Sequence, residues 1–511
     1  MTDAVDANGK DPSHPTNQRI SPYLSKVVSP ATVQQHTTPA LSLGPGKFKE
    51  SCANGAIHSI LNKEIEPSLP GDAMEAAPAN APAIEILGDP VQSDARFMVD
   101  RLADKAAYID HRIATFERDI EAACGEGYPH SVGTASQNAT YFVGRVCCDT
   151  EDGRLNPQSV VLEGSTAVSN GTRVKLDLSG CSNFRLFPGQ VVCVKGTNPS
   201  GFCIVASEVL PGLPLKQENT SGVSGGNFSS IVAAGPYTTN EDLRYEPLAV
   251  LLDYAATAKP DVLLLSGPFV DADHPMIRDG LAEETFDQLF ESRVLSQLRD
   301  FSSRVDGSTR ILLLPSPRDV HHDLTFPQGP QSTDAAPDMS SLTSLPNPCT
   351  FKCNNVVVGC SSVDWLMACT KEETSQSTLQ VDRLPTLAAH IVSQRSYFPL
   401  FPPPTSVPLD TSRGFGLELP CTPHVLVTAS DLAPFAKVAA VERPQLKALE
   451  GGNAGGGGEV SAQIKVVCIN PGRLTKGANA GTFAQVWWVP SSGTGGEQDG
   501  GMKCRVEVKK L

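Results

Sequence analysis

Residues 261–271 read DVLLLSGPFVD, and this stretch decides the fold of the C-terminal half of the chain. Residues 261–266 form a short apolar run that a Gly-Pro pair ends, which is the pattern of a strand buried on both faces. Strands of this kind belong to sheets whose faces are covered by other layers, so the stretch predicts a layered α/β domain.

The same pattern continues on either side of this stretch. Further buried or terminal strands are expected at 230–234, 310–315, 355–359, 424–428, 464–470, 482–489 and 503–510. Helical periodicity is expected at 239–258, where Thr239 and Asp242 resemble a capping box, and at 286–301 and 384–396. Strands that alternate with helices and then give way to a β-rich end predict one layered domain over residues 230–511.

In a domain of this kind, ligands bind beyond the carboxyl ends of the strands. The segments at those ends read AGPY from residue 234, SGPFVD from 266, PSPRDVHHD from 315 and NPGRL from 470. Their organisation resembles that of the calcineurin-like phosphoesterases. Those enzymes hold two metal ions with Asp-x-His, Gly-Asp-x-x-Asp, Gly-Asn-His-Asp/Glu and Gly-His-x-His motifs, because two-metal hydrolysis needs carboxylates and imidazoles at the strand ends.

Most of those ligands are replaced in this sequence. The degenerate positions are Gly267, Pro268, Asp271, Ser316, Pro317, Arg318, Asp319, Asn470, Pro471, Gly472 and Arg473. Pro268 cannot ligate a metal, and Arg318 would place a permanent cation in the site. We therefore expect no catalytic residue, no metal site and no cofactor, and we expect Asp319 to pair with Arg318 or with a backbone amide.

A metal site rebuilt from the remaining side chains is a competing hypothesis. It would use Asp271, His274, Asp319, His321, His322 and Asp323. No ligand is available after the first strand, and adjacent histidines need not point in the same direction, so this alternative is not favoured.

Upstream, the apolar period changes to two. Strand-like runs are expected at 140–149, 159–165, 173–179, 189–196 and 201–210, with turn residues between them. Five short strands predict a closed OB-fold barrel over residues 138–211. An OB barrel that binds single-stranded nucleic acid needs aromatic platforms and a basic groove. The aromatic residues are Tyr141, Phe142, Phe184, Phe187 and Phe202, and we favour a packing role for them over nucleic-acid binding.

Three segments flank the two folded parts. Residues 1–92 hold eleven prolines but only two aromatics, so disorder is expected there. Residues 93–125 predict an amphipathic helix that Ser93 and Asp94 cap and that packs on the folded body. Residues 212–229 are rich in Gly and Ser and predict a linker.

Composition narrows the classes of function. The 511 residues carry a net charge of −15, which disfavours a stand-alone nucleic-acid binder, because phosphate contacts need clustered Lys and Arg. No run approaches the about 18 uninterrupted apolar residues that a membrane helix needs, so a membrane protein is not expected.

An OB barrel followed by a phosphoesterase-type domain that has lost its ligands resembles the B-subunit family of the replicative DNA polymerases. The segments that carry this resemblance are LNPQSVVLEGS, LFPGQVVCVKGTNPSG, SGPFVDADHP, LPSPRDVHHD, NPCTFKCNN, QRSYFPLFPP and NPGRLTKGANAGTF, within residues 155–483. The delta and epsilon types share the architecture, but QRSYFPLFPP and NPGRLTKG are similar to the alpha type.

The resemblance implies a nuclear, non-catalytic scaffold of DNA polymerase alpha–primase. In that family the B subunit contacts the C-terminal domain of the polymerase catalytic subunit and so connects it to the small and large primase subunits for primer synthesis in DNA replication. It also implies that DNA is met only indirectly. An active metal-dependent phosphoesterase and an OB-fold binder of single-stranded nucleic acid remain the alternatives.

Overall fold

The computed structural model describes residues 47–67, 82–99, 101–124, 128–150, 153–218, 228–378, 381–442, 463–489 and 503–511. All of them belong to one unit, Pro45–Leu511. The part of the chain described here contains no helix with the length and apolar character of a membrane span.

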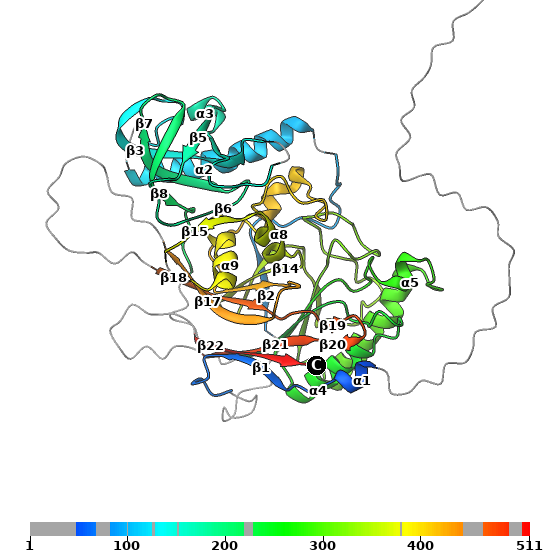
Figure 1. Ribbon diagram of the computed structural model, residues 1–511. Coiled ribbons are helices and arrows are strands. Elements are labelled where there is room, and N and C mark those ends of the chain that lie inside the picture. Colours follow the sequence, from blue (N-terminus) through cyan, green and yellow to red (C-terminus); the bar gives the residue numbers. More distant parts are fainter. Residues whose placement is uncertain are drawn as a thin grey trace, which may run out of the picture. The chain divides into compact units, whose positions relative to one another are not determined.

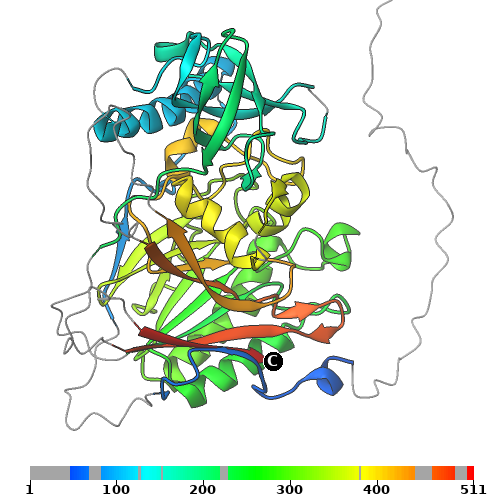
Figure 2. The same ribbon diagram turned by 60° about the vertical axis from the view of Figure 1, so that its left-hand side comes forward.

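A seven-stranded sheet forms one layer of the C-terminal half (Figures 1 and 2). Its strands, in spatial order, are β1 (Ile57–Leu61), β22 (Lys503–Lys510), β21 (Thr482–Val489), β9 (Phe228–Ala234), β10 (Val262–Ser266), β11 (Arg310–Leu314) and β12 (Leu342–Ser344). β9 to β12 are parallel, whereas β21 and β22 are antiparallel to their neighbours. Every residue of β10 is buried, because helices cover one face of this sheet and a second sheet covers the other.

The second sheet has six strands. They are β17 (Phe435–Glu442), β18 (Gln463–Asn470), β16 (Val425–Thr428), β14 (Val356–Ser361), β13 (Cys349–Cys353) and β2 (Ile84–Leu87). The two sheets enclose an apolar core in which the rings of Phe228 and Trp488 stack with centroids 5.5 Å apart.

Helices close the outer faces of both sheets. The first sheet is covered by α4 (Glu246–Ala258) and by a continuous segment made of α6 (Phe286–Leu289), the π-helical η1 (Phe290–Leu295) and α7 (Ser296–Arg304). The second sheet is covered by α8 (Trp365–Glu372) and α9 (Arg383–Ser393). The order of layers is therefore helix, sheet, sheet, helix, which is the layered α/β domain that the strand pattern predicts.

The expected barrel is also present. β3 (Ser136–Cys148), β4 (Val160–Glu163), β5 (Arg173–Asp177), β8 (Cys203–Leu210) and β7 (Val191–Asn198) close around an apolar core. Helix α2 (Leu102–Cys124) lies against the barrel through Ile113, Phe116 and Ile120. The remaining short elements are α1 (Lys47–Ser51), α3 (Thr166–Ser169), β6 (Phe184–Leu186), α5 (Pro275–Arg278), β15 (Thr374–Gln376), η2 (Thr411–Leu417), β19 (Thr475–Lys476) and β20 (Asn479–Ala480).

The prediction of disorder over residues 1–92 is wrong for two segments. Strand β1 pairs with β22 and β2 pairs with β13, so each extends an existing sheet by one edge strand. Phe48 on α1 is buried in the core of the first sheet. These segments carry few apolar residues of their own, and the sheet edges that they meet supply the pairing. Residues 1–46 and 68–81 lie outside the described residues.

Three other boundaries differ from the predictions. The helix expected from residue 93 begins at Leu102, because Met98 adopts a left-handed conformation and its N–H donates to Asp410. The helix expected from residue 239 begins at Glu246, and the predicted capping box is absent there. The expected linker 212–229 ends in strand β9, and its Leu213 is buried against α2, while residues 219–227 lie outside the described chain.

The barrel is joined to the two-sheet part by polar contacts that are shielded from solvent. Gln394, at the end of α9, accepts from the N–H of Val191 at 2.8 Å and donates to the carbonyls of Val191 and Pro211. β6 of the barrel region pairs with β15, and the buried Glu373 beside β15 contacts His390 at 3.1 Å and Arg185 at 3.7 Å. Since a buried polar group is costly unless it is paired, these contacts fix the barrel against the second sheet.

Replacing Gln394 by Ala should destabilise the protein by about 3 kcal/mol, because it leaves the N–H and the carbonyl of buried Val191 without partners. The measurement is urea unfolding followed by circular dichroism. Gln158→Ala, an exposed barrel position, is the matched control. Equal midpoints for the two variants would show that these hydrogen bonds do not hold the junction.

Candidate functional site

The strand ends of both sheets carry the residues that the sequence singles out. β9, β10 and β11 are parallel and in register, so the segments that follow Ala234, Ser266 and Leu314 leave the same edge of the first sheet. β14, β16 and β18 are parallel in the second sheet. Their last residues are Ser361, Thr428 and Asn470, respectively. These loops are where an α/β domain would place a ligand.

Asp319 lies at the centre of the first edge and is fully buried. Its carboxylate accepts hydrogen bonds from the backbone N–H groups of Phe269, Val270 and Ser316, the last two at 2.9 and 2.8 Å. The backbones of Asp271 and Asp319 also form an isolated antiparallel bridge. Asp319 therefore connects the loop after β10 to the loop after β11, as the expectation of a backbone partner required.

Gly267 is needed because of this contact. A Cβ atom at residue 267 would lie 2.4 Å from Oδ2 of Asp319 and 2.9 Å from Cβ of Ser316. Neighbouring Pro268 is buried and contributes no polar side chain. The Gly-Pro pair at the end of β10 thus makes room for the carboxylate.

Burial shifts two titratable groups at this edge. It raises the pKa of the Asp319 carboxyl to about 7, although the three backbone N–H groups oppose the shift. It lowers the pKa of the His321 imidazole to about 4, and this ring stacks on Phe290 with centroids 4.2 Å apart. Nε2 of His321 contacts the side chain of Gln331 at 3.3 Å. His321 is therefore a neutral packing residue at physiological pH.

Arg318 pairs with Asp271 and not with Asp319. Its Nε lies 3.0 Å from Oδ1 of Asp271, and its Nη2 contacts Oδ2, so the pair is bidentate. Asp273 lies 3.1 Å from the same guanidinium. Asp271 has a nearly buried side chain, and its two oxygens are both engaged by Arg318. Ser316 accepts from the N–H of Arg318, and Pro317 is half-buried with no polar side chain.

A second ion pair lies at the edge of the second sheet. Nε of the buried Arg473 is 2.7 Å from Oδ1 of Asp431. Burial raises the pKa of Asp431, but Arg473, with weaker help from Arg318 and Lys476, lowers it below its ordinary value. The influence of Arg318 on Asp431 shows that the two edges face each other electrostatically.

Asn470 organises the loop that carries Arg473. Its side-chain oxygen accepts from the N–H groups of Ser430 and Gly472, and its amide nitrogen donates to the carbonyls of Leu432 and Ala433. Gly472 has a φ of +74°, and a Cβ there would lie 2.3 Å from Oγ1 of Thr482. The carbonyl of Pro471 accepts from the same hydroxyl. All four residues of the 470–473 segment therefore have structural contacts.

The other histidines and Asp323 do not converge on a site. His274 caps α5, and its Nε2 lies 2.8 Å from the carbonyl of Thr239. Nε2 of His322 lies 3.0 Å from the carbonyl of Gly329. The side chain of Asp323 is exposed. Within the described ranges, no group of three or more His, Cys, Asp or Glu side chains has an arrangement that could hold a metal ion.

Sequence reasoning missed the partner of Arg473. Asp431 follows β16 by three residues, so the rule that directs attention to strand ends would have found the segment ASD at 429–431. The pairing itself was not predictable, since Asp431 and Arg473 are 42 residues apart in sequence.

The aromatic residues of the barrel divide into two groups. Tyr141, Phe142, Phe184 and Phe187 are buried, as the favoured packing role requires. Phe202 is 81% exposed, so a packing role is wrong for this residue.

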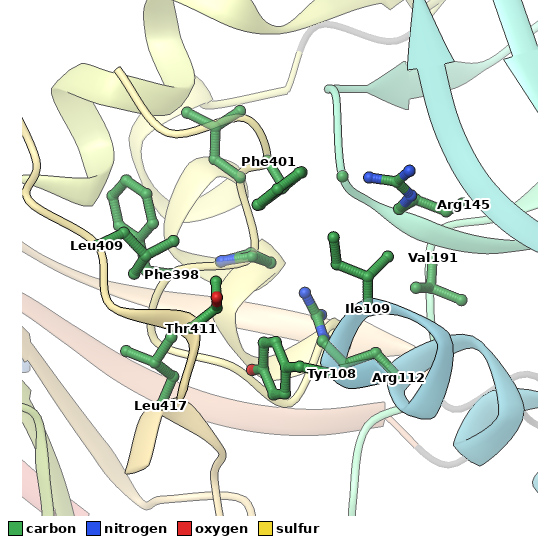
Figure 3. A pocket seen from close by; sticks show the side chains of 13 residues that line it. Tyr108, Ile109, Arg112, Arg145, Val191, Phe398, Phe401, Leu409, Thr411 and Leu417 are labelled. Carbon is green, nitrogen blue, oxygen red and sulfur yellow. The ribbon is translucent and has the colours of Figure 1, made fainter. Parts of the chain in front are cut away.

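A cavity lies where α2 and the barrel meet the segment 398–417, and it is too small for a ligand (Figure 3). Tyr108, Ile109 and Arg112 of α2 face Phe398 and Phe401 across it. Its volume is about 20 Å³, which is enough for a single water molecule.

Two known protein families match the two folded parts of the chain. The family of the B subunits of DNA polymerases alpha and epsilon matches residues 230–437, and the family of the OB domain of the DNA polymerase alpha B subunit matches residues 108–212. The DNA polymerase alpha B subunit of Rattus norvegicus is 30% identical over 442 residues, which cover 84% of this chain and 68% of the rat protein. That of Schizosaccharomyces pombe is 30% identical over 471 residues, with 85% and 74% covered. That of Bos taurus is 30% identical over 420 residues, with 81% and 67% covered.

Replacing Arg318 by Ala should lower the free energy of unfolding by about 3 kcal/mol, because the nearly buried Asp271 carboxylate loses its counter-ion. Adding Asp271→Asn should recover part of this loss, since the unpaired charge is then removed. Arg278→Ala, which breaks an exposed pair with Asp279, is the control. Urea unfolding is the measurement, and a double variant no more stable than Arg318→Ala would contradict the assignment.

His321 should make the unfolding free energy depend on pH. Its pKa is about 4 in the folded state, against 6.5 for an unperturbed histidine. The unfolded state therefore binds more protons between these values. The stabilisation is complete above about pH 7 and should fall by about 3 kcal/mol as the pH drops to 4.

The comparison is with His321→Phe, which keeps a ring beside Phe290 but cannot titrate. The stability of the parent relative to this variant should decrease on acidification. Parallel pH profiles for the two proteins would show that His321 is not held neutral.

Proposed function

The chain belongs to the B-subunit family of DNA polymerase alpha, and from this premise we propose that it is a non-catalytic scaffold that holds the polymerase catalytic subunit and primase together for primer synthesis. As a member of this family it is an accessory subunit of the polymerase. We further propose that it catalyses no reaction, that its partners are the polymerase catalytic subunit and primase, and that it acts in replication initiation and lagging-strand synthesis.

The contacts that the strand-end residues make within the chain support the proposal. Asp319 is engaged by three backbone N–H groups, Asp271 by both arms of Arg318, and Arg473 by Asp431. A catalytic carboxylate or imidazole must be free to meet a metal, a substrate or a water molecule.

The donor set does not fit the two metal ions of the enzymes that the domain resembles. Asp271 would have to release a bidentate guanidinium before it could ligate a cation, and Arg318 would remain beside it as a positive charge. Pro268 and Pro317 offer no side-chain ligand at the neighbouring positions. We therefore propose a phosphoesterase-like domain that is inactive.

The proposed partners are proteins. The C-terminal domain of the polymerase catalytic subunit would contact this chain, and the small and large primase subunits would join through it. DNA would be met through the assembly, in the nucleus. The net charge of −15 supports this division, because an acidic surface repels phosphate and suits protein contacts.

Pull-down of the full-length chain from native extract tests the scaffold. The polymerase catalytic subunit and both primase subunits should arrive together in comparable amounts by quantitative mass spectrometry. The matched control is Arg318→Ala with Asp271→Asn, which alters the strand-end edge and should retain all three partners. A chain that recovers none of the three subunits would contradict the scaffold.

The competing phosphoesterase has a separate readout. Purified protein is assayed for bound Mn and Zn by elemental analysis and for hydrolysis of a generic phosphodiester. Metal in stoichiometric amounts, with turnover that Asp271→Ala abolishes, would overturn the proposed inactivity whatever the pull-down recovers.

A further inference from the structure

Among the described residues of the barrel, Phe202 is the one large aromatic residue whose side chain is exposed to solvent. Its exposed fraction is 81%. An exposed phenylalanine forgoes the about 1.5–3 kcal/mol that its burial would contribute. A ring in that position on an ordered turn therefore suggests a contact that forms only with a ligand.

The turn that carries Phe202 is held firmly. Buried Asn198 donates through its side-chain amide to the carbonyl of Val132 at 2.8 Å and accepts from the N–H of Cys203. Gly201, with a φ of +80°, allows the tight turn and donates to the carbonyl of Asn198. The hairpin between β7 and β8 thus presents the ring in a fixed place.

Two cations lie beside the ring. The backbone N–H of Lys175 on β5 donates to the carbonyl of Phe202 at 3.3 Å. Arg173 and Lys175 are both exposed, and buried Val174 separates them, so their side chains leave the same outer face about 7 Å apart. Val205 on β8, 40% exposed, extends the apolar part of this face.

Two acidic residues nearby offset part of this positive charge. Glu163 on β4 is held by Arg145, and Arg173 reaches it only at 3.5 Å with its own side chain 61% exposed. Asp177, two residues beyond Lys175, accepts from the N–H of Ser179. Three cations, Arg145, Arg173 and Lys175, therefore stand against two carboxylates, Glu163 and Asp177, which leaves one cation in excess on this face of an otherwise acidic chain.

We propose that this face, formed by Arg173, Lys175, Phe202 and Val205, binds single-stranded nucleic acid. Phe202 stacks on a base, and the two cations contact successive phosphates. The face lies on the third barrel strand and on the loop between the last two strands, which are the parts of an OB barrel suited to this ligand. This goes beyond the proposed scaffold, in which DNA is reached only through the assembly.

Nucleic acid fits the face better than a peptide does. Two exposed cations beside one ring match the alternation of phosphate and base in a single strand, whereas an apolar peptide would offer these cations no acceptor of its own. The net charge of −15 opposes binding at long range, so the isolated chain should bind in the micromolar range and with a steep dependence on salt.

Fluorescence anisotropy of the full-length chain with a labelled oligothymidylate of about 16 nucleotides tests the proposal. Phe202→Ala should weaken binding about fivefold or more, and Phe202→Tyr, which keeps the ring, should not. Arg173→Glu with Lys175→Glu should reduce the slope of log affinity against log salt by about 1.4, measured between about 50 and 200 mM salt.

Matched controls exclude general effects of charge and hydrophobicity. Phe415→Ala removes another exposed ring, and Lys47→Glu with Lys63→Glu makes the same change of net charge elsewhere. Both should bind like the parent. Absence of saturable binding at about 50 mM salt, or equal binding by parent and Phe202→Ala, would overturn the proposal. So would a Phe202→Ala variant that keeps its affinity for the oligonucleotide but no longer retains the polymerase catalytic subunit, since the face would then be a protein contact.

Discussion

A single buried carboxylate organises the strand-end edge of the first sheet. Burying an ionisable carboxyl is costly unless donors surround it, and Asp319 meets three backbone N–H groups drawn from two loops. The loop after β10 must therefore turn back toward β11, and that turn leaves room only for Gly267. The same turn brings Asp271 beside Asp319, where Arg318 covers it. One polar constraint thus sets the backbone of both loops.

Two ion pairs of the chain itself lie at the strand ends of the two sheets. Arg318 follows a strand of the first sheet and Arg473 a strand of the second, and each is neutralised by an aspartate close to it. In each pair the opposite charge lowers the free-energy cost of burying an ionised side chain. Each pair also occupies side-chain atoms that could otherwise contact a ligand. The polar side chains of these strand ends are therefore already engaged by one another.

The sequence predicts the core strands well because their apolar patterns are local signals. Residues 262–265 are apolar over their whole length, and a barrel strand such as β5 alternates between exposed and buried side chains. β1 and β2 escape prediction because edge strands depend on the sheet that they join and not on their own apolar content. The start of α2 depends on a contact between Met98 and Asp410, 312 residues apart, and the turn that exposes Phe202 depends on a hydrogen bond from Asn198 to Val132, 66 residues away. Long-range partners of this kind leave no periodic trace.

Five of the seven distinctive sequence segments fall into two places in the fold. SGPFVDADHP, LPSPRDVHHD and NPGRLTKG form the closed strand-end edge, whereas LFPGQVVCVKG and QRSYFPLFPP meet at the junction of barrel and second sheet. In the junction, Gln394 binds Val191, and the N–H of Phe401 donates to the carbonyl of Pro188. The junction segments line only the small cavity of Figure 3, and both sets fix one part of the chain against another. A partner that touches two parts of a protein loses less entropy on binding when those parts are already fixed, because no further ordering is required. Residues that maintain such an arrangement therefore favour the binding of any partner that contacts both parts.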